Sequence, residues 1–273
     1  MWPWLETLGV AGLGGLGALA GCCFSRLRRP WWVLGYLIPL AFVAAFVLAT
    51  SVRWLEFYWP FRWLMAGRRE FALLALVGTM VLTTPQSRLP RRGQRVAVSV
   101  FMVLLVARLS VLPFLAPALY GRKLAALATQ LDASGVCRQA TDYTCGPAAA
   151  VTALRRLGFP AEEGELAARC RTNPFSGTAP DILCEVLRKR YGPLGLRCQY
   201  RPFASIAELK QAGLTLAVVK FEWLVDHYVT VLEVTDQAVV VGDPLLGRVT
   251  LSHQEFAARW RKVGVVLGRR HPN

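Results

Sequence analysis

Residues 1–120 contain three apolar segments, each long enough to cross the hydrocarbon core of a membrane. They run from Leu5 to Phe24, from Trp31 to Ser51 and from Val96 to Leu119. Backbone amides and carbonyls find no water in lipid, so such segments must form helices with internal hydrogen bonds. A fourth segment, Phe71–Thr84, is shorter and fits a span, a tilted partner helix or a re-entrant piece. The sequence therefore predicts a transmembrane helical region of three or four spans.

Arginines are frequent in the loops between these segments. Their distribution indicates on which side of the membrane each loop lies. With four spans, one side receives seven basic residues: Arg26, Arg28, Arg29, Arg88, Arg91, Arg92 and Arg95. The other side receives six: Arg53, Arg62, Arg68, Arg69, Arg122 and Lys123. Because basic residues accumulate in cytoplasmic loops, four spans place the chain after residue 120 outside, whereas three spans place it inside. We expect four spans and an external C-terminal domain.

The net charge of +15 does not predict a nucleic-acid partner. Twelve arginines and three glutamates lie in the first 120 residues, where the excess belongs to the membrane loops. The rest of the chain shows no basic stripe interleaved with aromatic residues, which is the usual pattern of a nucleic-acid surface. The lipid bilayer is the expected partner of the first half.

Two features inside the apolar segments leave alternatives open. Leu19-Ala-Gly-Cys22 matches a lipoprotein cleavage box, but Glu6 precedes it and arginines follow it, which is the wrong polarity for a signal peptide. Arg108 interrupts the last segment near its middle, where a charge is costly in lipid. It either pairs with Glu56 or Glu70 or marks a break in the helix.

The second half of the chain contains a cysteine in a setting that favours reactivity. Cys145 stands just ahead of Gly-Pro, and apolar residues then recur at helical spacing as far as Leu157. Pro147 fits the first turn of the predicted helix, and Asp142 or Thr144 is expected to cap it. Unpaired amides and the helix dipole favour the thiolate there, and the thiolate is the form that attacks carbonyl carbon.

A nucleophilic thiolate needs a base and a third group that orients the base. Of the three histidines, His271 lies in a charged tail, and His253 opens a helix inside a capping box that begins at Ser252. His227 begins a strand-like run, and the returning strand ends at Gly242-Asp243-Pro244. A hairpin of these strands would bring the His227 imidazole beside the Asp243 carboxylate, which fixes the tautomer and stabilises imidazolium.

Gln139 completes this set of residues. Its amide lies six residues upstream of Cys145 and can point an N–H at a developing oxyanion, with the Cys145 backbone N–H as second donor. No Cys-x-x-Cys pair or Cys/His cluster occurs, so neither a metal nor another cofactor is expected. The other four cysteines of this half are either buried small hydrophobes or partners in two disulfides: Cys137, Cys170, Cys184 and Cys198.

The remaining pattern predicts an α+β domain, with helices first and an antiparallel sheet after them. The expected helices are Ala161–Arg169, Ala179–Tyr191, Ser205–Ala212 and Phe256–Trp260. The expected strands are Leu196–Tyr200, Leu214–Phe221, Tyr228–Val234 and Ala238–Val241. We therefore divide the chain into a transmembrane region (1–120), a connector (121–133) and a C-terminal domain (134–273).

These segments resemble the bacteriocin-processing, double-glycine leader peptidases, a family of papain-like cysteine peptidases. The resemblance runs from Ser134 to Leu267 and rests on RQATDYTCGPAAA, DHYVTVLEV and VVGDPLLGRVTLSHQEFAARW. It implies four roles: Gln139 as oxyanion donor, Cys145 as nucleophile, His227 as base and Asp243 as orienter of the base. Other positions also match the pattern of this family, namely Gly177-Thr178, Phe256 and Trp260.

The resemblance implies a membrane-anchored cysteine endopeptidase that cleaves leader peptides after a small-residue pair such as Gly-Gly, in a bacterial cytoplasmic membrane. The family's usual companion is an ATP-hydrolysing transporter, but no Gly-rich phosphate loop ending in Gly-Lys-Ser/Thr occurs in this chain. A transporter partner would be a separate protein. Two alternatives stay open: acyl transfer or amide hydrolysis by the same thiol, and a domain that holds a peptide for an export partner without cutting it.

Overall fold

The computed structural model describes residues 3–28, 30–64, 69–222 and 225–270. Arg29, Arg68 and His271, named above, lie outside the described residues, as does the side chain of Glu70. The chain divides into two compact units. The helical unit comprises Met1–Thr50 and Pro60–Leu119, and the α+β unit comprises Ser51–Trp59 and Tyr120–Asn273.

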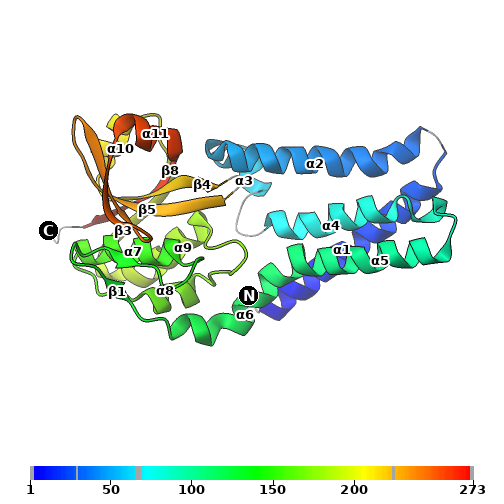
Figure 1. Cartoon of the computed structure of the whole chain (residues 1–273), viewed down its shortest axis with the longest axis horizontal. Helices are drawn as coiled ribbons and strands as arrows, with labels where there is room; N and C mark the ends of the chain where they lie inside the picture. Colours follow the sequence, from blue (N-terminus) through cyan, green and yellow to red (C-terminus); the bar gives the residue numbers. More distant parts are fainter. Residues whose placement is uncertain (1–2, 29, 65–68, 223–224, 271–273) are drawn as a thin grey trace. The chain divides into compact units, whose positions relative to one another are not determined.

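Among the described residues, three helices, all in the first half of the chain, are long and apolar enough to cross a membrane (Figure 1). They cover Leu5–Arg26, Trp31–Ser51 and Arg92–Ala116, which confirms the three long predicted segments as helices of spanning length. The shorter predicted segment also forms a helix, α4. The described elements are α1 (Pro3–Arg26), η1 (Trp31–Val33), α2 (Leu34–Ser51), α3 (Phe61–Leu64), α4 (Arg69–Thr83), η3 (Gln86–Arg88), α5 (Arg92–Val106), η4 (Ala107–Val111) and α6 (Leu112–Ala125).

Helices α1 and α4 pack closely because α1 carries glycine where the two backbones meet. A Cβ atom on Gly17 would overlap the Leu76 carbonyl, and one on Gly21 would overlap the Thr83 hydroxyl. The hydroxyls of Thr79 and Thr83 donate to carbonyls within α4, each at 2.8 Å. Small residues at helix contacts are typical of packing in lipid, where burial of apolar surface gives no driving force.

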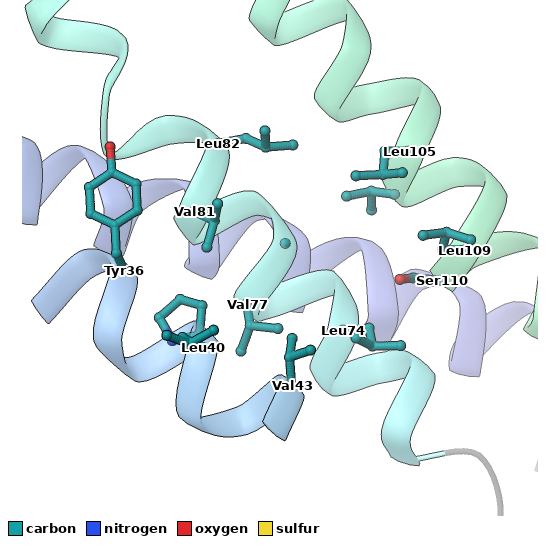
Figure 2. A pocket seen from close by; sticks show the side chains of 13 residues that line it. Tyr36, Leu40, Val43, Leu74, Val77, Val81, Leu82, Leu105, Leu109 and Ser110 are labelled. Atoms are coloured by element: carbon teal, nitrogen blue, oxygen red, sulfur yellow. The ribbon is translucent and has the colours of Figure 1, made fainter. Parts of the chain in front are cut away.

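An apolar cavity of about 470 Å³ lies between α2, α4 and the end of α5 (Figure 2). Leu40, Val77 and Leu105 are among its lining side chains, one from each of these helices. No charged side chain occurs among the lining residues, and the polar ones are Tyr36 and Ser110. The cavity therefore has the character of the acyl-chain region of a bilayer and offers no anchor for a charged ligand.

The last of the three long apolar helices changes its helical hydrogen bonding at Arg108. Helix α5 passes into the π-helical turn η4, Ala107–Val111, before α6 continues from Leu112. Of the alternatives considered for Arg108, the break in the α-helix is confirmed. Glu56, one of the partners considered for it, forms an ion pair with Arg53 at 3.1 Å.

The α+β unit is built on a six-stranded antiparallel sheet with the strand order β3–β8–β4–β5–β6–β7 (Figure 1). The strands are β3 (Leu196–Pro202), β4 (Thr215–Glu222), β5 (Val225–Val234), β6 (Ala238–Asp243), β7 (Gly247–Ser252) and β8 (Trp260–Arg269). A second, two-stranded sheet pairs β1 (Gln130–Leu131) with β2 (Cys137–Arg138). The helices are α7 (Cys145–Arg156), α8 (Glu163–Arg169), α9 (Pro180–Tyr191), α10 (Ile206–Ala212) and α11 (His253–Arg259), with the 3-10 turn η5 (Gly192–Leu194). The predicted α+β class is confirmed.

Two hydrophobic cores form on the two faces of the large sheet, because neighbouring residues of a strand point to opposite faces. On β5, Tyr228 belongs to the core that includes α7 and α9, whereas Val229 belongs to the core with Phe256 of α11. Helix α7 is buried along most of its length. It therefore holds the position of its first residue, Cys145, through packing rather than through surface contacts.

Most predicted elements of this unit are present with ends shifted by a few residues, but the strands β1, β2, β7 and β8 were not predicted. The predicted last helix, Phe256–Trp260, begins earlier at His253 and ends at Arg259. Strand β8 then starts at once, and its apolar alternation is interrupted by Arg261 and Lys262. Lys262 adopts a left-handed backbone conformation with φ of 56°, which local propensity does not predict for a lysine.

The α+β unit also includes a segment that follows the second long apolar helix. Ser51–Trp59 contains the 3-10 helix η2 (Arg53–Phe57). The Arg53 Nε donates to Asp226 Oδ2 of β5 at 2.8 Å, and the Arg261 Nε of β8 donates to the other oxygen, Oδ1, at 2.8 Å. One carboxylate is thus held between two guanidinium groups, one of them supplied by a residue predicted to lie in a membrane loop.

Apolar contacts tie the same segment to the sheet. The rings of Phe57 and Tyr200 of β3 lie 5.0 Å apart, centroid to centroid, and Phe57 packs against the core under α7 and α9. The Ser51 carbonyl accepts a hydrogen bond from Arg261 Nη1 at 3.3 Å. A piece of the range predicted as membrane, 1–120, therefore folds with the C-terminal half.

Candidate active site

Cys145 is the first residue of α7, as the sequence predicts. Thr144 is the N-cap by position, but its hydroxyl donates to the Thr141 carbonyl at 3.1 Å instead of accepting from the first turn. The prediction that Asp142 or Thr144 caps the helix is therefore wrong. The first amides of α7 and the positive end of its dipole therefore have no acceptor from the Thr144 side chain.

His227 and Asp243 are brought together by strands β5 and β6. The register pairs Thr230 with Gly242, so the start of β5 lies beside the end of β6. The His227 Nε2 lies 2.9 Å from Asp243 Oδ1, which is the hydrogen bond expected from the sequence. The same oxygen accepts the Leu245 amide at 2.8 Å. Burial acts to raise the pKa of Asp243, but the bonds from His227 and the backbone amides outweigh it and lower that pKa.

The Cys145 thiol is the other group that acts on the His227 ring, and it contributes to raising the pKa of that ring. Because Nε2 faces Asp243, Nδ1 is the ring nitrogen left for Cys145. Burial alone lowers the pKa of His227, but the hydrogen bonds and charges of Asp243 and Cys145 outweigh it and raise the pKa to about 9. These contacts therefore stabilise the fold fully below the ordinary pKa of 6.5, and the stabilisation is lost as pH rises through about 9.

Gln139 is anchored next to Asp243 through the backbone. Its amide nitrogen N donates to the Pro244 carbonyl at 3.0 Å, and its side-chain Nε2 donates to the Thr141 carbonyl at 2.8 Å. The side-chain oxygen is buried and lacks a hydrogen-bond partner among the described residues. A primary amide has two N–H groups, so one remains for an oxyanion while the other holds the side chain in place.

The buried carboxylate of Glu163 supports this loop, and the sequence analysis missed it. Glu163 Oε1 accepts the Ala140 amide at 2.9 Å, and the Cys137 thiol donates to Oε2 at 3.9 Å. Burial raises the pKa of Glu163. In the sequence it is one of three acidic residues at the start of a helix, where an exposed side chain is the ordinary expectation. No local pattern marks it as buried.

Two residues close the space next to Cys145 on the side of the sheet. The Tyr228 hydroxyl donates to the Thr178 carbonyl at 3.0 Å, which links β5 to the loop before α9. A Cβ atom on Gly146 would lie 3.3 Å from Thr178 and 3.4 Å from the Tyr228 ring. Glycine at position 146 therefore allows the start of α7 to approach these two residues.

Exposed apolar side chains lie beside the His227–Asp243 pair. The Phe221 ring is 57% exposed and its centroid lies 5.7 Å from that of His227. Leu246, three residues after Asp243, is 68% exposed. Exposed apolar side chains of this kind next to a reactive group are suited to contact an extended chain. No group of three or more metal-ligating side chains occurs among the described residues.

The family model of the Peptidase C39 family matches residues 134–271, about half of the chain. The chain belongs to the Peptidase C39 family. The matched range contains Gln139, Cys145, His227 and Asp243, together with Glu163. It does not contain Ser51–Trp59, so this C39 domain is completed by a segment that the family match leaves out.

Curated relatives align with the same half of the chain. A protein of Methanothermobacter marburgensis is 30% identical over 122 residues, which is 45% of this chain and 80% of the relative. A protein of Methanothermobacter thermautotrophicus is 27% identical over 131 residues, or 48% of this chain and 86% of the relative. The likeness thus covers most of each relative and concerns the C39 domain.

Similar solved structures include other C39 peptidase domains. A double glycine motif protease from an AMS/PCAT transporter, solved with the leader peptide, is 15% identical, with a TM-score of 0.43 and coverage of 52% of this chain and 92% of that chain. The peptidase domain of Streptococcus ComA, a bifunctional ABC transporter, is 21% identical, with a TM-score of 0.43 and coverage of 49% and 96%.

Proposed function

We propose that this protein is a membrane-anchored cysteine endopeptidase in which Cys145 is the nucleophile. The observation that carries the proposal is the assembly of Cys145, His227 and Asp243 from three elements of the C39 domain, with the imidazole between the thiol and the carboxylate. A thiolate next to an imidazolium that a carboxylate orients is the arrangement that nucleophilic catalysis by cysteine requires.

In the proposed reaction, the Cys145 thiolate attacks the peptide carbonyl carbon, and a thioester acyl-enzyme forms as the amine leaves. His227 holds the proton of the thiol and donates it to the leaving amine. It then takes a proton from the water that hydrolyses the thioester. The free N–H of Gln139 and the Cys145 backbone N–H stabilise the oxyanion. Asp243 keeps the ring oriented and its positive charge stabilised throughout.

The proposed substrate is a peptide with a small-residue pair, such as Gly-Gly, before the cleaved bond. This follows from the resemblance to double-glycine leader peptidases, and Phe221 and Leu246 give apolar contacts for the residues on either side. A separate peptide transporter is the partner that such processing implies. The same thiol could pass its acyl group to another acceptor, and a domain that only holds the peptide would leave it uncut.

We further propose that the chain crosses the membrane four times. Ser51–Trp59 and the C39 domain belong to one unit, so both lie on the same face of the membrane. The chain between them must then cross an even number of times. Arg92–Ala116 supplies one crossing, and α4 has to supply the other. Its 15 residues span only about 23 Å, so local thinning of the bilayer or extension into the following loop must complete the crossing.

The charge pattern then sets the orientation. Four crossings place the seven arginines named above, among them Arg28, Arg88 and Arg91, on one face and the C39 domain on the other. The arginine-rich face is proposed to be cytoplasmic and the domain external, in a bacterial cytoplasmic membrane. The ranges 1–120, 121–133 and 134–273 remain the proposed domain limits, with Ser51–Trp59 assigned to the peptidase.

A cleavage assay with the full-length protein in lipid nanodiscs tests the proposal. A synthetic peptide with a Gly-Gly pair is incubated with the wild type and with Cys145→Ala, and mass spectrometry identifies the products. Cleavage after the pair by the wild type and its loss in Cys145→Ala, with unchanged thermal unfolding, are expected. Cys23→Ser, on the exposed side of α1, is the matched control and should retain activity.

Three other results would overturn parts of this proposal. Cleavage that survives in Cys145→Ala removes the mechanism, and a product that carries an added amine indicates acyl transfer. Tight binding of the uncut peptide by the wild type would indicate a holding domain. For the topology, a reporter fused after Asn273 should be active only outside the cytoplasm, and cytoplasmic activity would contradict the external location.

A further inference from the structure

Cys184 and Cys198 form a close pair of thiols outside the proposed active site. Cys184 lies on α9 and is buried, with 2% of its surface exposed, whereas Cys198 lies on β3 and is half-buried. Their sulfur atoms are 2.8 Å apart. A disulfide bond is about 2.05 Å long, so the sulfurs need to move together by less than about 1 Å to be joined.

The surroundings activate one thiol of the pair. The Cys198 thiol donates a hydrogen bond to the Cys184 sulfur, and the Arg188 Nη2, one turn further along α9, lies 3.5 Å from the same sulfur. The bond from Cys198 and the Arg188 charge lower the pKa of Cys184, and the pKa of Cys198 is raised. The contacts from Arg188 and Cys198 therefore favour the thiolate at Cys184, and thiolate is the form that exchanges with disulfides.

Cys137 shows how a cysteine of the same domain is kept unreactive. It is fully buried, and its sulfur lies 3.9 Å from the Glu163 carboxylate. Burial and the Glu163 charge raise the pKa of Cys137 to about 12. A negative neighbour thus suppresses the thiolate at Cys137, whereas a positive neighbour supports it at Cys184.

We propose that Cys184 and Cys198 form a reversible disulfide that staples α9 to β3. The oxidant is a low-molecular-weight disulfide such as oxidised glutathione. The proposal goes beyond the peptidase activity and does not depend on it. The sequence left the four other cysteines of this half as either buried thiols or partners in two disulfides. The proposal assigns one disulfide, between Cys184 and Cys198, and leaves Cys137 and Cys145 as thiols.

The reaction is a two-step exchange. The half-exposed Cys198, which the oxidant can reach, first gives up its proton to solvent by way of the Cys184 sulfur to which it is bonded, attacks one sulfur of the oxidant, and forms a mixed disulfide while one thiolate leaves. The Cys184 thiolate then attacks the Cys198 sulfur and releases the second thiolate. Two electrons pass from the two cysteines to the oxidant, whose disulfide is reduced to two thiolates, and the one proton of the Cys198 thiol is released overall.

The position of the staple gives it a structural consequence. Strand β3 is an edge strand of the large sheet, so it is bonded to a strand, β8, on one side only. The same strand carries Tyr200, which packs against Phe57 of the segment Ser51–Trp59. A covalent bond from Cys198 to α9 would therefore fix the edge of the sheet to which that segment is attached.

The test uses the purified full-length protein in detergent, incubated with reduced or oxidised glutathione. The samples are unfolded in N-ethylmaleimide, digested and analysed by mass spectrometry. Oxidised samples should contain the Cys184–Cys198 linked peptide as the main disulfide, and reduced samples should carry maleimide on both residues. The Tm of the oxidised protein should also exceed the Tm of the reduced protein by about 5 °C.

Single variants make the result specific. Cys184→Ser should retain glutathione on Cys198, because the thiol that resolves the mixed disulfide is gone. Cys137→Ser is the matched control and should form the linked peptide as the wild type does. Maleimide on both cysteines after oxidation, lasting glutathione on wild-type Cys198, or a main disulfide that includes Cys145 would each overturn the proposal.

Discussion

The helical unit and the α+β unit are held together by different kinds of contact. In the helical unit, α1 and α4 meet through glycine, and the threonine hydroxyls at the contact are satisfied within their own helix. In the α+β unit, buried polar groups are satisfied by residues far away in the sequence, as Asp226 is by Arg53 and Arg261. Damage to one kind of contact should therefore stay within its own unit.

The difference is the one expected when the long apolar helices lie in lipid, as proposed above. In lipid the backbone must be satisfied inside each helix, so the contact between helices depends on shape. In water, burial of apolar surface drives folding, and buried polar groups such as Glu163 and His227 persist because each has hydrogen-bond partners.

Gly17→Leu should have the largest effect, which is loss of the folded helical unit. The added side chain would collide with the backbone of α4 at Leu76, and backbone cannot move aside cheaply. Size-exclusion chromatography in detergent should show aggregation or loss of the protein. Gly9→Leu on the same helix is the matched control, because the space around Gly9 is open. A Gly17→Leu protein that elutes as the wild type would contradict the close packing.

Asp243→Ala should lower kcat/KM by roughly 10²–10⁴-fold, because the imidazole loses the group that orients it. The wild-type activity should fall as pH rises through about 9, where His227 loses its proton. In the variant this fall should move to lower pH, since the hydrogen bond and charge that raise the pKa are gone. A pH profile of kcat/KM measures both effects. Asp236→Ala, at an exposed turn, is the control.

An unchanged basic limb in Asp243→Ala would contradict the assignment of that limb to His227. A drop in activity without a change in the pH profile would instead assign Asp243 a role in folding. Thermal unfolding of the variant, measured in the same buffer, separates the two.

Arg53→Ala should destabilise the α+β unit by roughly 3 kcal/mol, because removal of one partner leaves a buried carboxylate with less compensation. Asp226 would keep only the bond from Arg261, and Glu56 would lose its ion pair. Differential scanning calorimetry of the full-length protein should show a lower Tm. Arg62→Ala, an exposed arginine of α3, is the matched control. Equal Tm values for Arg53→Ala and wild type would show that the segment is not part of the unit.

Glu163→Ala should lower the free energy of unfolding by about 1–3 kcal/mol, because a buried amide is left without its acceptor. The Ala140 amide donates to this carboxylate, so the neighbouring Gln139 loses its support and activity should fall with stability. Glu163→Gln retains an acceptor and should restore most of both. Urea unfolding and peptide cleavage, measured side by side, check the prediction. A Gln variant as poor as the Ala variant would contradict it.

Lys210→Ala should have the smallest effect, with no measurable change in Tm. Its ammonium lies 2.7 Å from Asp236, but the two side chains are 51% and 92% exposed. Water and salt screen such pairs, so they add little to stability. A clear drop in Tm would show that the α+β unit depends on surface charges as well as on buried networks.

Much of the α+β unit could be predicted because its local patterns agree with the fold. The capping box at Ser252 is present as predicted, with Glu255 bonded back to the Ser252 amide. The hydrogen bond between His227 and Asp243 was predictable because a hairpin converts distance in sequence into proximity. Cys145 was placed at the start of α7 by Gly-Pro and the helical spacing that follows.

The features that could not be predicted depend on contacts between distant residues. Thr144 does not cap α7, because its hydroxyl donates to the Thr141 carbonyl. Glu163 resembles an ordinary acidic residue of a first turn, and its burial is decided by Ala140 and Cys137. Arg53 looks like one more basic loop residue until Asp226 is placed beside it. Charge counting cannot tell such an arginine from one that sets membrane topology.

The most direct test of the account is the rate at which Cys145 reacts with iodoacetamide near pH 6. The full-length wild type is compared with His227→Ala, and mass spectrometry follows the modification of residue 145. We expect rapid labelling of the wild type and labelling at least about 10-fold slower without the imidazole, because His227 holds the proton and stabilises the thiolate. Equal rates in the two proteins would contradict it.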